Sequence, residues 1–124
     1  MFQMLAIATG GAVGAVARFL VSGWTYAWLG RTFPYGTLSV NVIGSLLMGF
    51  LYVLFIERLS VDGAWRSLLL VGFLGAFTTF STFSIETLNL VEEGAILKAL
   101  ANIIVSVVVC LLAVWAGVVA GRQL

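Results

Sequence analysis

A run of hydroxyl and phenyl side chains between Gly72 and Glu86 is the part of the sequence best suited to chemistry. From residue 78 to residue 84, five of the seven side chains are hydroxyls, and phenylalanines are interleaved with them: Thr78, Thr79, Ser81, Thr82 and Ser84, with Phe77, Phe80 and Phe83. Hydroxyls can bond to the backbone and compete with regular helix. Non-helical backbone at membrane depth is tolerated only where it is buried in protein or lines a water-filled cavity. The stretch therefore predicts a broken transmembrane helix that binds or conducts a polar species.

The same side chains suggest that the polar species is a small ion. Phe80 and Phe83 are three residues apart, on one helical face, and a phenyl ring is slightly positive at its edge. Hydroxyls and the Asn41 amide are donors for a small, strongly accepting anion. A break between Gly75 and Thr79 would also free backbone carbonyls, which are ligands for a small cation. The alternative is that this aromatic stripe is only core packing, but the glycines, the hydroxyl density and Glu86 outweigh it.

Composition places these residues in an integral membrane protein. The chain has 124 residues, of which 62% are hydrophobic and 9% charged, with a mean hydropathy of +1.17. A span of the hydrocarbon core takes about 20 apolar residues, so four transmembrane helices exhaust the sequence. We expect one all-α domain over residues 1–124, with its first apolar stretch retained rather than cleaved as a signal peptide. The net charge of +1 argues against a nucleic-acid partner, and Cys110, the only cysteine, is expected to be a small buried residue.

The polar residues of the four expected helices cluster at one depth. The expected helices are residues 4–28, 34–56, 65–91 and 96–119. Both termini and the second loop would then lie on one side of the membrane. The polar residues fall in the half nearer the other two loops: Arg18, Asn41, Glu86, Asn102 and Ser106. Arg18 and Glu86 come at similar depth, so an ion pair or a shared water cavity is plausible, and Gly10-x-x-x-Gly14 offers a close-packing face.

The loop charges predict little preference for either orientation. Arg58, Arg66 and Arg122 face the side with the termini, whereas Arg31 and Lys98 face the other side. The positive-inside rule sets orientation through such a bias, and here the bias is almost absent. Insertion in both orientations is therefore expected. Because four short helices cannot both enclose a pore and pack a core, we expect an oligomer. If both orientations exist, an antiparallel two-fold dimer would restore the inverted symmetry that larger transporters encode as repeats.

Three motifs closely resemble the Fluc family of fluoride channels, also called CrcB. The motifs are Gly10-Gly11-x-x-Gly14-Ala15-x-x-Arg18-Phe19, Gly36-Thr37-Leu38-x-x-Asn41-x-x-Gly44 and Gly72-Phe73-x-Gly75-x-x-Thr78-Thr79-Phe80-Ser81-Thr82-Phe83-Ser84-x-Glu86. The resemblance covers almost the whole chain. It implies a dual-topology antiparallel homodimer in the inner (plasma) membrane, in contact with lipid, which exports fluoride passively through two pores and is not an enzyme.

The resemblance also implies roles for particular residues. Phe80 and Phe83 would be an aromatic box in each pore, with Asn41 as a donor. The remaining roles are a polar track of Ser81 and Thr82, a pore-lining position at Ser106 or Cys110, a vestibule at Arg18, and a structural Na+ held by the carbonyls of Gly75 and Thr78 of both subunits.

The residues alone support only permeation of a small ion or solute by a dimer, and fluoride comes from the resemblance. Two alternatives stay open at this stage. One is a small multidrug-type proton-coupled exporter, with Glu86 as its proton site. The other is a non-transporting accessory subunit whose polar residues hold helices together.

Overall fold

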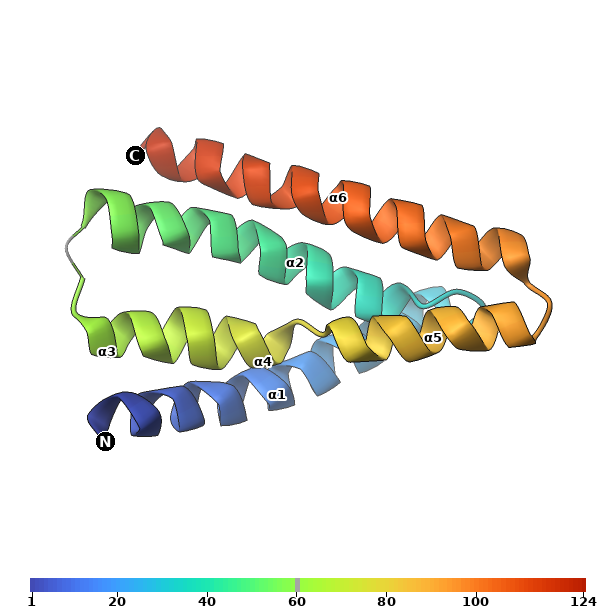
Figure 1. Ribbon diagram of the computed structural model, residues 1–124, viewed down its shortest axis with the longest axis horizontal. Helices are drawn as coiled ribbons and strands as arrows, with labels where there is room; N and C mark the ends of the chain where they lie inside the picture. The colour runs from blue at the N-terminus through green and yellow to red at the C-terminus, as the bar shows by residue number, and fades with distance from the viewer. Residues whose placement is uncertain (60) are drawn as a thin grey trace.

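The computed structural model describes residues 1–59 and 61–124, and these residues form four long helical spans. The spans Phe2–Leu29, Tyr35–Arg58, Gly63–Glu92 and Ile96–Arg122 are each long and apolar enough to cross a membrane. They run alongside one another, with both termini at the same end as the connection between the second and third spans (Figure 1). The prediction of an all-α fold with four spans is confirmed, with boundaries close to those expected.

Two of the spans are built from several helical segments. The first span is α1 (Phe2–Leu29) and the fourth is α6 (Ile96–Arg122). The second joins α2 (Tyr35–Tyr52) to a π-helical segment, η1 (Val53–Arg58). The third contains α3 (Gly63–Arg66), the π-helical η2 (Ser67–Leu74), α4 (Gly75–Phe77) and α5 (Phe80–Glu92).

Glycines bring the first span against the third. A Cβ atom added to Gly14 would meet the Phe73 backbone, and one added to Gly10 would meet the Leu68 carbonyl. A Cβ atom on Gly72 would lie 2.7 Å from the Ile7 oxygen. Only hydrogen at Cα allows the two backbones to approach so closely. The close-packing face expected from Gly10 and Gly14 is therefore confirmed.

A second glycine crossing joins the second span to the fourth. A Cβ atom on Gly49 would meet the Val114 carbonyl, and one on Gly117 would meet the Leu46 carbonyl. The two closest crossings thus connect spans that run in the same direction, first with third and second with fourth. In Figure 1, α1 accordingly lies against α3 and α4, while α2 lies beside α6.

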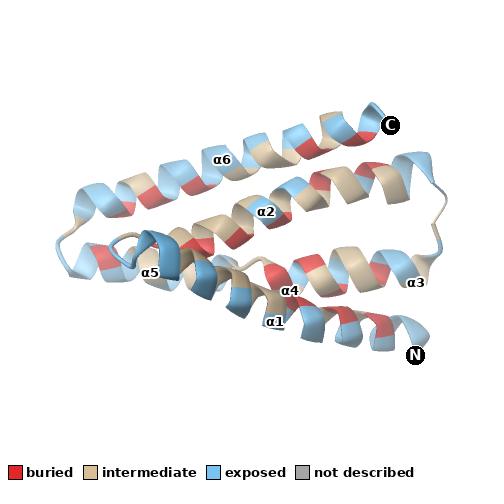
Figure 2. Cartoon of the chain, turned by 180° about the vertical axis from the view of Figure 1, so that it is seen from behind, coloured by how far each residue is buried: buried red, intermediate tan, exposed pale blue. Residues whose placement is uncertain are grey.

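The buried residues form narrow stripes on the inward faces, and apolar side chains remain exposed outside them (Figure 2). The fully buried side chains include Val40, Val53 and Leu74.

At the end with the termini, Arg58 donates to the backbone oxygens of Arg122 at 2.8 Å and Leu124 at 2.7 Å. A cation at the carboxyl end of a helix satisfies carbonyls that lack intrahelical partners, so Arg58 ties η1 to the end of α6.

Candidate functional site

The third span is interrupted between α4 and α5. Thr78 has φ −89° and ψ 158°, and Thr79 has φ −151° and ψ 120°, both extended conformations. The helix restarts at Phe80 because the Thr79 hydroxyl oxygen accepts a hydrogen bond from the Thr82 backbone amide at 3.2 Å. Threonine is a favoured residue at this capping position. The hydroxyl-rich sequence therefore supplies the N-cap of the second half-helix.

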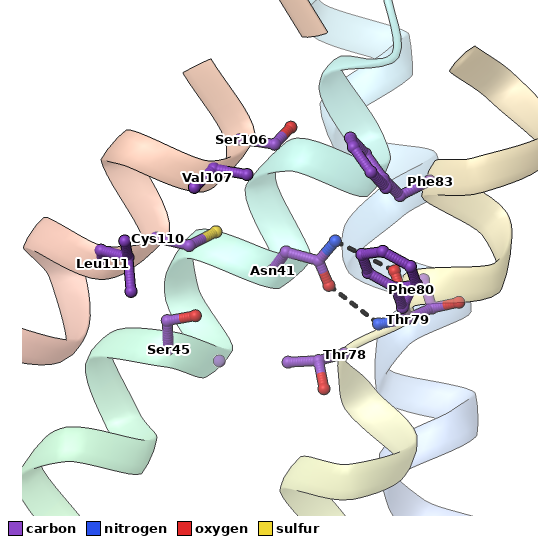
Figure 3. Close-up of a pocket in the computed structure, with 11 residues that line it drawn as sticks. Asn41, Ser45, Thr78, Thr79, Phe80, Phe83, Ser106, Val107, Cys110 and Leu111 are labelled. Atoms are coloured by element: carbon purple, nitrogen blue, oxygen red, sulfur yellow. Dashed lines mark hydrogen bonds between the residues drawn. The ribbon is translucent and has the colours of Figure 1, made fainter. Parts of the chain in front are cut away.

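Asn41 of α2 pairs with the extended backbone at this interruption. Its Nδ2 donates to the Thr79 carbonyl at 3.0 Å, and its Oδ1 accepts from the Thr79 amide at 2.8 Å. One side-chain amide thus satisfies both backbone groups of a residue that has lost helical partners. Figure 3 shows this pair of bonds crossing from α2 to the third span. Asn41 keeps a second N–H, which is free to donate to another group.

Arg18 pairs with another freed backbone group. Its Nε donates to the carbonyl of Ala76 at 3.0 Å. The Glu86 carboxylate instead accepts a hydrogen bond from the Tyr26 hydroxyl at 3.2 Å through Oε2, and its Oε1 is buried without a partner among the described residues. The ion pair suggested between Arg18 and Glu86 is therefore wrong, because the break offers the guanidinium a carbonyl. Within the described ranges, the one ion pair is that of Arg122 with Glu57.

A cleft of about 380 Å³ lies between α2, the interruption and α6 (Figure 3). It brings four of the predicted pore residues together from three spans, namely Asn41, Phe80, Phe83 and Ser106. The other lining residues are Gly44, Ser45, Thr78, Thr79, Val107, Cys110 and Leu111. None of these side chains is an Asp, Glu, Lys or Arg. The cleft therefore offers hydroxyl, amide and ring-edge groups without a fixed charge.

The two cleft phenylalanines differ sharply from the third member of their stripe. The rings of Phe80 and Phe83 lie 5.3 Å apart at 43°, and the Phe80 side chain is 77% exposed. Phe77 is only 3% exposed and stacks on Phe73 at 5.8 Å. The helical interruption separates them, since it turns the residues after Thr79 onto a different face. Phe77 is thus a core residue, whereas Phe80 and Phe83 face the cleft.

A second hollow, of about 460 Å³, adjoins the interruption from the side of α1. Arg18, Tyr26 and Arg31 line it together with Thr79 and Thr82. Thr79 therefore lines both hollows, and Thr82 belongs to this one rather than to the cleft. Ser81 and Glu86 line neither, and Glu86 lies in a polar hollow with Asn89 and Lys98.

The carbonyls of Gly75 and Thr78 accept no hydrogen bond from the described residues. Gly75 is also exposed, and a Cβ atom there would meet only the Leu70 oxygen, at 3.9 Å. Free carbonyl oxygens are ligands of hard cations. In the described part of the chain, no group of three or more His, Cys, Asp or Glu residues could hold a metal.

Sequence reasoning missed three features of the site. Tyr26 is not among the predicted site residues, yet its hydroxyl donates a hydrogen bond to Glu86. Cys110 was expected from composition to be buried, yet it is half-exposed; it lines the cleft together with Ser106, the other pore-lining position that the resemblance allows. Asn102 was predicted only as one of the polar residues clustered at one depth, and its bond to Thr87 at 2.9 Å was not predicted. The four-residue spacing of Asn102 and Ser106 places these two side chains on one helical face, but it carries no signal for Thr87.

Comparisons with known proteins agree on one family. A family model described as CrcB-like protein, Camphor Resistance (CrcB), matches residues 5–118. A protein of Magnetococcus marinus is 58% identical over 97% of this chain and 98% of its own length. One of Geobacter sulfurreducens is 50% identical over the full length of both chains. One of Methylococcus capsulatus is 60% identical over 98% of this chain, which spans only 54% of that relative. All three relatives carry the name fluoride-specific ion channel FluC.

We predict that Asn41→Leu loosens the interruption. The Thr79 amide and carbonyl would both lose their partner, and an unsatisfied buried polar group costs about 1–3 kcal/mol. Hydrogen exchange of the Thr79 amide in detergent should therefore accelerate. Ser45→Ala is the matched control, because Ser45 lies one turn along α2 in the same cleft. Equal Thr79 exchange in both variants would show that Asn41 does not hold this backbone.

Proposed function

This chain belongs to the CrcB-like family, and from that membership we propose that it is a fluoride-selective channel of the inner membrane that exports fluoride passively, without catalysis. The observation that supports the proposal most directly is the cleft, which combines two phenyl rings, an amide donor and hydroxyls without a charged side chain. The names of the relatives support fluoride as the ion.

The chemistry of the cleft suits a small anion. Fluoride entering the cleft gives up water, and it needs donors to replace that hydration. The free N–H of Asn41 is one such donor, and its direction is set because the other N–H and the Oδ1 are both engaged by Thr79. The ring edges of Phe80 and Phe83 add weak positive potential. No Lys or Arg side chain lines the cleft to hold the anion tightly, so binding stays weak enough for release.

We propose that the ion path continues from the cleft toward Arg18. Thr79 lines both hollows, so it connects the cleft to the space that Thr82, Arg18 and Arg31 share. The Ser81 hydroxyl lies 3.3 Å from that of Thr79, which extends the polar track. Arg18 and Arg31 then provide an electropositive mouth that concentrates anions. Glu86 lies beyond this mouth, beside Tyr26.

The functional unit in this proposal is an antiparallel homodimer with two pores. The weak charge bias of the loops supports insertion in both orientations. The exposure of Phe80, at 77%, supports a surface that another copy covers.

We also propose that a Na+ ion joins the two copies at the interruption. The unpaired carbonyls of Gly75 and Thr78 fit such an ion in donor chemistry. One chain supplies too few of these oxygens to surround a cation, so both subunits would contribute. The ion would balance the carbonyl dipoles that the interrupted helix leaves exposed, which fixes the two interruptions against each other.

Exchanging the cleft rings tests the channel proposal. Phe80→Ile, Phe83→Ile and the double variant keep bulk but remove the positive ring edge, so fluoride efflux from proteoliposomes should fall about tenfold or more. Phe77→Ile is the control, since Phe77 is buried outside the cleft and should conduct once folded. Gel filtration separates misfolding from a blocked pore. Wild-type efflux from the folded double variant would show that the rings only pack.

Removing sodium tests the cation site. Replacing NaCl by N-methylglucamine chloride should shift the detergent-solubilised protein from dimer toward monomer on gel filtration. Gly75→Val should have the same effect even in NaCl. The valine side chain has room within one chain, but in the proposed dimer it would crowd the partner subunit at the interruption. Thr78→Ala keeps its carbonyl and should remain dimeric in NaCl. A dimer that is indifferent to sodium would contradict this part of the proposal.

Charge added to the second loop tests the dual orientation. Lysines introduced beside Arg58 and Arg66 should force one orientation, so antiparallel partners become scarce and fluoride efflux falls. Co-expression with a copy carrying extra lysines near Lys98 should restore efflux. A strongly biased copy that is fully active by itself would contradict the antiparallel dimer.

A further inference from the structure

A line of hydrogen bonds connects the cleft residue Ser106 to the backbone of Phe83. The Ser106 hydroxyl donates to Asn102 Oδ1 at 3.3 Å, and Asn102 Nδ2 donates to Thr87 Oγ1 at 2.9 Å. Thr87 Oγ1 then donates to the Phe83 carbonyl at 2.8 Å. Asn102 is only 2% exposed and Ser106 only 8% exposed. The Ser106 end of the line is therefore shielded from competing water.

The direction of every bond in this line follows from its last member. A carbonyl can only accept, so the single proton of the Thr87 hydroxyl goes to Phe83. Thr87 can then only accept from Asn102, which requires the Nδ2 of the amide to face it. The Oδ1 consequently faces Ser106 and accepts a hydrogen bond from its hydroxyl, which engages the one proton of that group. Ser106 is left with lone pairs, and no proton, for the cleft that it lines.

This polarity matters because Ser106 lies at the same end of the cleft as Phe83 (Figure 3). An anion needs a donor, and lone pairs repel it. To use Ser106, an anion must draw its proton away from Asn102 Oδ1. Asn102 does not line the cleft, so any influence it has on the anion acts through the Ser106 hydroxyl.

We propose that Asn102 is a positioning residue that keeps the Ser106 proton from the permeating anion, with Thr87 fixing the amide that does so. This inference rests on the proposed fluoride channel. The anion competes with Asn102 for the proton, which weakens its binding at this end of the cleft. Weak binding favours release and hence conduction.

Thr87→Val and Thr87→Ser form the matched pair that tests this direction. Valine has the shape of threonine without the hydroxyl, so the amide of Asn102 becomes free to turn its Nδ2 toward Ser106. Ser106 would then accept that bond and direct its proton into the cleft. The fluoride concentration that gives half-maximal efflux should fall about threefold to tenfold. Thr87→Ser keeps the hydroxyl and should keep a half-saturating concentration near that of the wild type.

The same pair in a Ser106→Ala background distinguishes positioning from packing. Without the Ser106 hydroxyl, Thr87→Val should no longer change the half-saturating concentration. A shift of equal size in both backgrounds, or no shift in either, would overturn the inference. If Thr87→Val is not monodisperse on gel filtration, Asn102→Leu removes the same acceptor and should lower the half-saturating concentration likewise. Absence of fluoride efflux from wild-type protein would overturn the proposed function and this inference with it.

Discussion

A backbone that leaves the helix inside a membrane must find partners for its amides and carbonyls, and this requirement organises the whole chain. The interruption at Thr78 and Thr79 exposes such groups, and side chains from two other spans satisfy part of them. Asn41 is placed by α2, and Arg18 by α1, so both helices must pack at one register for the interruption to be stable. The Gly75 and Thr78 carbonyls that stay unpaired are then the ones available to a ligand. Structure and proposed function thus share one origin in the loss of helical hydrogen bonds.

The glycine crossings determine where the chain is tight and where it is open. They bring α1 against η2, and α2 against α6, at backbone distance. The α5 helix takes no part in either crossing. It is connected to α6 instead by the hydrogen bond between Asn102 and Thr87. The cleft occurs where close packing gives way to this looser, polar contact, and an ion path needs such a gap.

Much of this arrangement could be predicted from residue spacing, and the rest depends on features that spacing does not contain. The four spans follow from apolar length, and the packing face of α1 follows from Gly10 and Gly14. The common depth of Asn41 and Ser106 also brought them correctly into one region. Depth along a helix gives no rotation about its axis, however, so Glu86 was matched to Arg18 rather than to Tyr26. A sequence does not show which backbone carbonyls lack a helical partner, so the bond between Arg18 and the Ala76 carbonyl could not be predicted. The separation of Phe77 from Phe80 likewise depends on the turn that the interruption imposes.

The pattern of the glycine crossings has a consequence for biosynthesis. The first span packs most closely on the third, and the second on the fourth, so neither crossing joins neighbours in sequence. The ribosome synthesises the spans in order, so the crossing at Gly10 and Gly72 cannot form before the third span is made. The crossing at Gly49 and Gly117 likewise requires the fourth span. The first two spans can contact each other early, as Thr25 and Ser39 do at 3.0 Å, but the Arg18 and Asn41 side chains still lack their backbone partners on the third span. The two glycine crossings of this chain thus form late: the first requires the third span and the second requires the fourth, since contacts between distant segments cannot form before both segments exist.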